Sequence, residues 1–142
     1  MVYSALDIAK YIIYYEHSKG REVSNLRLQK LLYFVQAKFF QIYGEPCFYE
    51  NMEAWDFGPV VVSVYHEYKI FAALDIMMNI EKPPLPKKVS AVIDNILDYV
   101  APYPTFQLVD ITHEQKPWID AKANYFNHTI SMKSLRDYFY KG

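Results

Sequence analysis

The stretch SNLRLQKLLYFVQAKFFQIYGEP, Ser24 to Pro46, decides the fold. Its apolar residues recur at steps of three and four, which is the spacing of one face of an α-helix. Ser24 is a favoured N-cap residue, and Gly44 followed by Pro46 is typical of a helix end. We therefore predict a long helix over residues 24–43 whose apolar face lies in the core: Leu28, Leu31, Leu32, Val35, Phe39 and Ile42.

The composition is that of a single domain with a substantial core. The chain has 142 residues, of which 52% are hydrophobic. A chain of this length buries about two-thirds of its unfolded surface on folding. It also contains 14 Tyr, 9 Phe and 2 Trp, which are residue types that anchor protein interfaces. We expect one domain over residues 1–142, with aromatic rings that either complete the core or form a binding surface.

The charge argues against nucleic acid as a partner. Fifteen Lys and Arg against sixteen Asp and Glu give a net charge of −1, so no overall positive field attracts phosphate or anionic lipid. Asn25, Arg27, Gln29 and Lys30 are residue types that read bases, but the apolar face of their helix indicates a core element instead. We expect neither a nucleic-acid nor a membrane partner.

The single cysteine and the N-terminus predict a cytoplasmic protein. Cys47 is alone, which excludes an intramolecular disulfide and suits a reducing compartment. The N-terminal MVYSALDIAKYI lacks the basic segment and cleavage site of a secretion signal. Apolar runs also fall short of the length of a membrane-spanning helix.

Other helix signals flank the central one. Ser4 with Asp7 resembles a capping box for a helix to Ser18, and Ser131 caps a helix over Met132–Tyr140. Between them lie a helix over Val89–Val100 after a proline-rich linker, a short helix that Thr105 can cap, and another that Pro117 begins. The predicted fold is mainly α: a compact single-domain bundle of about six helices with one small β-hairpin.

The hairpin is predicted from two aromatic-rich runs, Cys47–Glu50 and Met52–Asp56, which meet at Glu50-Asn51. Pro59 then suits the first position of a helix, and Asp56 and Gly58 would lie at the N-terminus of that helix, with Asp56 as its cap. Asp56-Phe57-Gly58 is also the magnesium-binding tripeptide of protein kinases. The Gly-rich loop, strand lysine and catalytic loop of a kinase are absent from this sequence, so we read the tripeptide as a structural turn.

Candidate catalytic and metal-binding residues are few. His66-Glu67 and His113-Glu114 begin like the zinc motif HExxH, but Ile70 and Pro117 stand where the second histidine belongs. Cys47 has no local signature of a nucleophile, and a lone cysteine is commonly a small buried hydrophobe. We predict no metal, no cofactor and no catalytic residue.

The segment THEQKPW, Thr112 to Trp118, leaves two interpretations open. His113 could act as a base with Glu114 as its partner, although adjacent side chains in a turn usually point apart. In the structural interpretation, Thr112 and His113 bind free backbone groups at a helix junction while Trp118 fills the core.

Four strings in one order resemble a known family: LQKLLYFVQA (28–37), YGEP (43–46), EAWDFGPVVVSVY (53–65) and THEQKPW (112–118). Together they are similar to the Panacea domain, also called the SocA-like or phage-associated GepA-type domain, over about residues 4–139. The resemblance implies a prophage-associated antitoxin that neutralises a cognate toxin by direct association, without catalytic residues. It also implies structural importance for Glu53, Trp55, Gly58, Pro59, Tyr65, Thr112, His113, Pro117 and Trp118.

The hairpin and the helix after it are our predicted toxin-binding surface, formed by Tyr49, Trp55, Phe57, Tyr65 and Tyr68. Three alternatives stay open. One branch of the family consists of adaptors that deliver a toxin to a cytoplasmic protease. The chain could instead be a hydrolytic enzyme that uses His113 and Glu114, or a structural phage component that forms a homo-oligomer.

Overall fold

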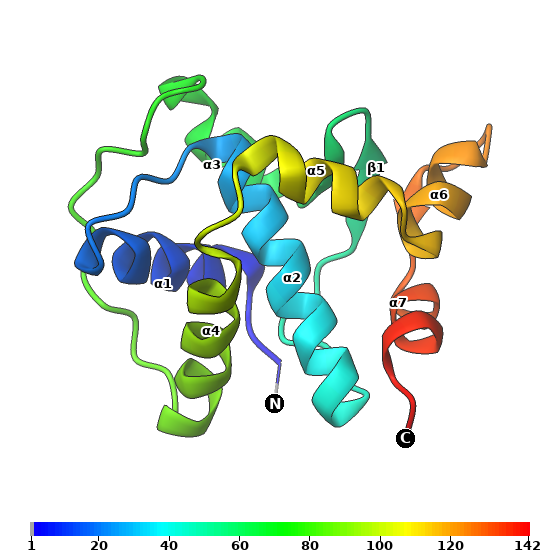
Figure 1. Ribbon diagram of the computed structural model, residues 1–142, viewed down its shortest axis with the longest axis horizontal. Helices are drawn as coiled ribbons and strands as arrows, with labels where there is room; N and C mark the ends of the chain where they lie inside the picture. Colours follow the sequence, from blue (N-terminus) through cyan, green and yellow to red (C-terminus); the bar gives the residue numbers. More distant parts are fainter. Residues whose placement is uncertain (1) are drawn as a thin grey trace.

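Helix α2 (Asn25–Tyr43) runs through the middle of the molecule, and the other helices are arranged around it (Figure 1). The computed structural model describes residues 2–142. Within them the remaining helices are α1 (Ala5–Ser18), α3 (Val62–Tyr68), the 3-10 helix η1 (Lys69–Phe71), α4 (Lys87–Val100), α5 (Thr105–His113), α6 (Lys116–Ala123) and α7 (Met132–Phe139). The prediction of a mainly helical fold with a small β element is confirmed, with seven α-helices over this range rather than about six.

Three serines start helices as the sequence predicts. The hydroxyls of Ser4, Ser24 and Ser131 accept hydrogen bonds from the backbone N–H three residues on, at the beginnings of α1, α2 and α7. Each bond satisfies one of the N–H groups that a helix start leaves without a partner. Gly44 ends α2 in the left-handed conformation, with φ 68°, which glycine adopts without the steric penalty of a side chain.

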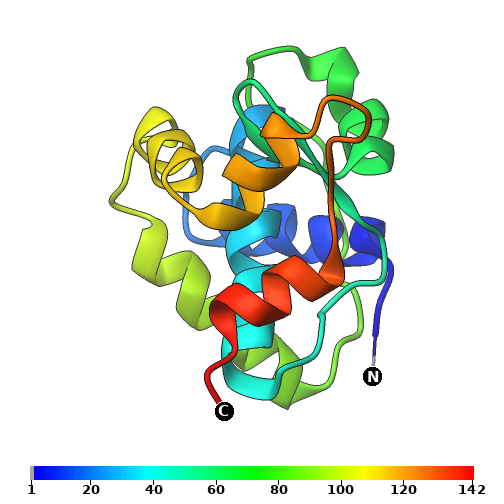
Figure 2. The ribbon, with the colours of Figure 1, turned by 90° about the vertical axis from the view of Figure 1, so that its right-hand side faces the viewer.

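Most of α2 is buried in the core. Leu28, Leu31, Leu32 and Val35 are fully buried. Helices α1 and α4 contact α2 on one side, and α7 contacts it on the other (Figures 1 and 2). Part of the tyrosine surplus completes this core, because Tyr11, Tyr33 and Tyr68 are among the largest buried side chains.

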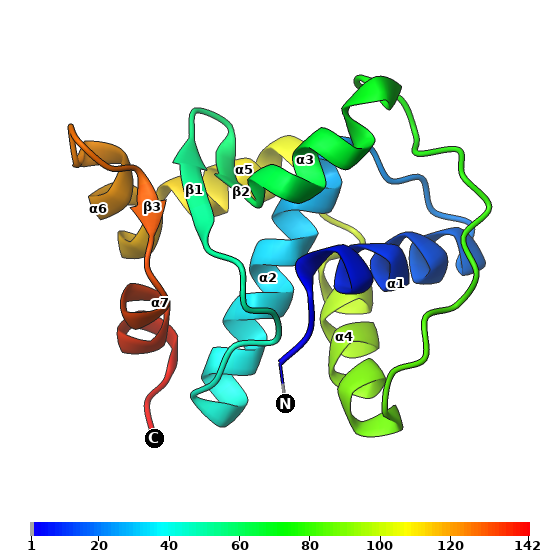
Figure 3. The same ribbon diagram turned by 180° about the vertical axis from the view of Figure 1, so that it is seen from behind.

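A small antiparallel sheet lies beside α2 (Figure 3). It consists of β1 (Met52–Trp55), β2 (Gly58–Val60) and β3 (Thr129–Ile130), in the order β2-β1-β3. Trp55 pairs with Gly58, and Met52 pairs with Ile130. The sequence gives no signal for β3, a two-residue strand that forms only because the α6–α7 connection passes β1.

The predicted hairpin register is wrong. The hairpin joins β1 to β2 through the turn at Asp56 and Phe57, and Cys47–Glu50 is not one of its strands. Gln36 of α2 gives the physical reason. Its amide oxygen accepts from the N–H groups of Cys47 (2.7 Å) and Phe48 (3.2 Å), and its amide nitrogen donates to the Phe48 carbonyl (2.8 Å). A buried side chain thus supplies the partners that a neighbouring strand would have supplied.

The predicted helix start at Pro59 is also wrong. Pro59 belongs to β2, and α3 begins at Val62 after an N-cap at Val61. Proline lacks a backbone N–H, so an edge strand tolerates it where a ladder bond is not required. Asp56 consequently does not cap a helix, and its side chain is 84% exposed.

Several large apolar side chains face the solvent, among them Phe57, Ile70, Phe106, Tyr125 and Phe126. Within residues 2–142, no helix combines the length and the hydropathy that crossing a bilayer requires.

Replacing Gln36 by Leu should destabilise the fold strongly, because three backbone groups around Cys47 and Phe48 would lose their partner. We expect a loss of about 3 kcal/mol in the free energy of unfolding, measured by urea denaturation. Gln41→Leu is the control, since Gln41 is exposed on the same helix. Equal effects of the two substitutions would contradict this account.

Candidate functional site

The turn of the β-hairpin is clamped by the junction of α5 and α6. His113 lies 2.8 Å through Nε2 from the carbonyl oxygen of Asp56, and Trp118 donates its indole N–H to the carbonyl of Trp55 at 2.9 Å. The carbonyl only accepts, so Nε2 of His113 carries the proton in this contact. The two rings also lie against each other, with centroids 4.1 Å apart. The segments 53–65 and 112–118 therefore meet at one place.

Gly58 lies where the hairpin approaches α2 and α5 most closely. Its φ is +102°, and a Cβ at this position would be 2.8 Å from Lys30 Nζ and 2.9 Å from Thr112 Oγ1. Thr112 is fully buried and donates its hydroxyl proton to the Val109 carbonyl. A side chain at residue 58 would thus be unfavourable for two reasons: the backbone conformation, and the close contacts with Lys30 and Thr112.

Two buried side chains of α2 complete the outer edge of β2. Lys30 donates to the Pro59 carbonyl, and Gln29 accepts from the Val61 N–H at 2.9 Å. Gln29 in turn donates to Asn25 at 3.0 Å, whose amide donates to the Tyr65 carbonyl of α3 at 3.0 Å. A helix therefore takes the place of a fourth strand, and the hairpin is fixed on both sides.

Lys30 is buried without a carboxylate among its hydrogen-bond partners in residues 2–142. Burial disfavours the charged ammonium and lowers the pKa of Lys30 from 10.5 to about 7. Near neutral pH this lysine is therefore partly uncharged. Sequence reasoning placed Lys30 on the central helix but gave no signal that its amine is buried.

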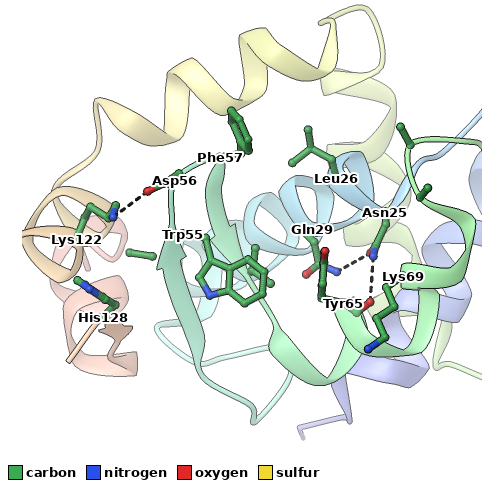
Figure 4. Close-up of a pocket in the computed structure, with 14 residues that line it drawn as sticks. Asn25, Leu26, Gln29, Trp55, Asp56, Phe57, Tyr65, Lys69, Lys122 and His128 are labelled. Carbon is green, nitrogen blue, oxygen red and sulfur yellow. Dashed lines mark hydrogen bonds and ion pairs between the residues drawn. The ribbon is translucent and has the colours of Figure 1, made fainter. Parts of the chain in front are cut away.

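A groove of about 610 Å³ lies across the hairpin, between α3 and η1 on one side and α6 on the other. Figure 4 shows Trp55 near its middle, with Lys69 toward one end and the Lys122–Asp56 ion pair toward the other. The Trp55 and Tyr65 rings meet edge to face with centroids 5.0 Å apart. The lining is mainly apolar, which is typical of sites that bind small molecules or single side chains.

The five aromatic residues predicted as a binding surface divide into three groups. Tyr49 and Phe57 are 64% and 59% exposed, whereas Trp55 and Tyr65 are half-buried in the groove wall. Tyr68 is only 1% exposed, so its inclusion in a surface was wrong. It is the last residue of α3, and its side chain turns toward the core.

Phe106 belongs to the exposed aromatic surface, and sequence reasoning missed it there. It is 60% exposed, and its ring centroid lies 6.0 Å from that of Phe57 in an edge-to-face contact. The sequence predicts a short helix from Thr105 but does not indicate which of its apolar residues is exposed. Helix α5 buries Leu108, Val109 and Thr112, which leaves Phe106 on the outside.

The arrangement required for catalysis by His113 and Glu114 is not observed. His113 binds the hairpin turn, whereas the side chain of Glu114 is exposed and makes no hydrogen bond or ion pair within residues 2–142. Burial raises the pKa of the Cys47 thiol to about 12, so the thiolate that nucleophilic chemistry requires is disfavoured. Over the described chain, His, Cys, Asp and Glu side chains do not gather in groups of three that could hold a metal ion.

The family description "Antitoxin SocA-like, Panacea domain" matches residues 28–119, a range that contains the hairpin, its clamp and most of the groove. The chain belongs to this Panacea family. It is 35% identical over 115 residues to Antitoxin SocA of Caulobacter vibrioides (strain NA1000 / CB15N), which covers 72% of this chain. The match spans 61% of the length of that relative. No solved structure matches the chain.

The structure shows where the strings that resemble the Panacea family lie in the fold. Leu28–Ala37 lies in α2, and the strings 53–65 and 112–118 form the hairpin and its clamp. The resemblance inferred from the sequence is thereby confirmed at the level of the family. Its residues form one connected unit of this Panacea domain.

Replacing Gly58 by Ala should cost about 2–4 kcal/mol of unfolding free energy, from backbone strain together with the contacts to Lys30 and Thr112. Gly20→Ala is the matched control, because Gly20 also has a positive φ, of +71°, but has open space around it. We expect that control to lose about 1 kcal/mol. Urea denaturation of both variants measures the difference, and equal losses would rule out the close approach.

The buried Lys30 predicts a pH dependence of stability. Its folded pKa of about 7 lies below that of the unfolded chain, so between the two values the unfolded state binds the extra proton and stability rises with pH. Relative to Lys30→Met, the unmodified protein should gain about 1 kcal/mol per pH unit between about pH 7.5 and 9. Lys10→Met, at an exposed position of α1, should leave the slope unchanged. Parallel curves for Lys30→Met and the unmodified protein would contradict the burial argument.

Proposed function

We propose that this Panacea domain is an antitoxin that neutralises a cognate protein toxin by binding it directly, without catalysis. The proposal is supported by family membership together with one feature of the surface. That feature is the exposed ring pair formed by Phe57, in the turn of a hairpin held on both sides, and Phe106 of the adjacent helix α5. We further propose that the protein acts in the cytoplasm and is encoded by a prophage.

The clamp supports this proposal on energetic grounds. A mobile loop loses conformational entropy when it binds a partner, and this loss weakens binding. A fixed hairpin has already lost that entropy when the protein folds. Aromatic side chains are frequent among the residues that dominate interface energies. Phe57, Phe106 and Tyr49 are exposed, and Trp55 and Tyr65 line the adjacent groove. A toxin held on this surface would be inhibited by occlusion or by being fixed in one conformation.

The decisive experiment is co-expression with the product of the neighbouring reading frame. That product should arrest growth alone and should be tolerated when this protein is present. Phe57→Ser with Phe106→Ser should abolish protection and weaken binding by about thirtyfold, as expected for the loss of about 2 kcal/mol at an interface.

Tyr99→Ser is the matched control, because Tyr99 is 70% exposed on α4 and lies outside the groove. Circular dichroism should show unchanged helicity for all variants. Protection that survives the double substitution would exclude this surface, and a harmless neighbouring product would contradict the antitoxin function. Toxin abundance, followed by immunoblotting, should stay constant if neutralisation is by binding. A fall in abundance would instead support delivery to a protease.

A further inference from the structure

The groove beside the hairpin has a chemistry that restricts what can occupy it. We propose that it receives a segment of the toxin in which a bulky apolar side chain stands next to a carboxylate. This inference rests on the proposed antitoxin function and names the class of segment that its site would recognise. Three features of the groove carry it: space, apolar walls and one cation without a partner.

The space is kept open by two small residues. Ala72 and Ala73 line the groove, and both are exposed. Ala72 ends η1 with φ 52° and ψ −127°, a conformation that is unfavourable for a residue with a Cβ. The chain therefore turns sharply here with short side chains, and a longer side chain at residue 73 would fill the groove. The volume of about 610 Å³ is that of a site for one or two large side chains.

The walls select for an apolar group. Trp55, Tyr65 and Phe57 present rings, and Leu26 and Val60 add aliphatic surface. The amides of Asn25 and Gln29 also line the groove, but they are already bonded to each other, to the Tyr65 carbonyl and to the Val61 N–H. The two amides therefore have few unbonded donors or acceptors that could bind a polar ligand.

The two lysines at the ends of the groove differ in whether they are free to pair with a ligand. Lys122 is paired with Asp56 at 2.9 Å, and the nearby Glu53 accepts from the Trp55 indole at 3.1 Å. The side chain of Lys69 is exposed, and its ammonium group makes neither a hydrogen bond nor an ion pair within residues 2–142. A carboxylate beside the apolar side chain would gain Lys69 as a partner, whereas a cationic group would not.

A second copy of this chain fits this chemistry poorly. Its most exposed ring pair, Tyr125 and Phe126, lies in the segment Asn124–Asn127, which contains no carboxylate. Other exposed apolar side chains do adjoin acidic residues, but those carboxylates already have partners. Glu50 beside Tyr49 accepts from the Ala5 N–H. Asp75 beside Leu74 accepts from the Val23 N–H and contacts His17. The carboxylates beside Tyr99, Ile119 and Tyr138 pair with Arg21, Lys116 and Lys133. A foreign protein segment is therefore the occupant that the charges favour.

The test uses the two tryptophans of the chain as reporters. The Trp55 side chain lines the groove and its indole N–H is bonded to Glu53, whereas the indole N–H of Trp118 is bonded to the Trp55 carbonyl. The full chain, labelled with ¹⁵N, is titrated with acetyl-Ala-Phe-Asp-Ala-amide and with the same peptide carrying Asn or Lys in place of Asp. The Trp55 signal should shift saturably, and the Asp peptide should bind at least about threefold more tightly than the Lys peptide.

Two variants of groove residues and one control variant make the outcome specific. Ala73→Phe should abolish the shift by filling the groove, whereas Ala91→Phe, at an exposed position of α4, should leave it unchanged. Lys69→Glu should reverse the order of the Asp and Lys peptides. The unshifted Trp118 signal serves as the check that each variant is folded.

Several results would overturn the inference. They are equal binding of the Asp and Lys peptides, a normal shift with Ala73→Phe, and no saturable shift up to about 10 mM peptide, a weak limit for a ligand of this size. A concentration-dependent Trp55 shift without peptide would assign the groove to a second copy, and saturation by oligothymidine alone would assign it to nucleic acid. If these tests fail while Phe57→Ser with Phe106→Ser still abolishes protection, the antitoxin function stands and only the groove assignment falls.

Discussion

The structure depends on one interaction between the central helix and the edge of the sheet. Lys30 and Gln29 of α2 hold the outer backbone groups of β2, so the helix that forms the core also positions the hairpin. This arrangement places an amine in the interior, where the charged form is strongly disfavoured. Gly58 is the geometric counterpart, because only a residue without a side chain lets the hairpin approach Lys30 and Thr112 this closely.

The fixed hairpin explains why the aromatic residues serve two purposes. Tyr11, Tyr33 and Tyr68 fill the interior, and Trp118 links α6 to β1 through its indole N–H. With these contacts in place, Phe57 and Phe106 are left on the outside and touch each other. The same residue types therefore supply both rigidity and an exposed surface, and the difference lies in which element carries them.

The sequence was sufficient for the starts of α1, α2 and α7, but it was insufficient for the sheet and for the start of α3. Ser4, Ser24 and Ser131 act locally, through bonds to the N–H three residues on, so the helix starts could be predicted from neighbouring residues. The hairpin register depends on Gln36 and Lys30, which are distant in sequence from the backbone groups they bind. A local pattern cannot report such contacts, and this is why Pro59 was assigned to a helix.

For the candidate site, sequence reasoning identified the segments but not their geometry. The strings around Trp55 and His113 were singled out, yet their meeting at the Asp56 carbonyl requires the folded chain. Tyr68 was predicted at the surface but is buried, and the exposure of Phe106 was missed. A short helix with apolar residues on several faces does not reveal which face is covered.

The outward-facing backbone groups at the edge of β2 already have hydrogen-bond partners, and this affects how the protein behaves at high concentration. An open strand edge is a template on which other chains polymerise, and proteins commonly block such edges. Here Lys30 and Gln29 already occupy the outward-facing groups of Pro59 and Val61. The molecule is thus protected against β-type aggregation on that side. A binding partner must be held through side-chain contacts rather than by adding a strand to the sheet.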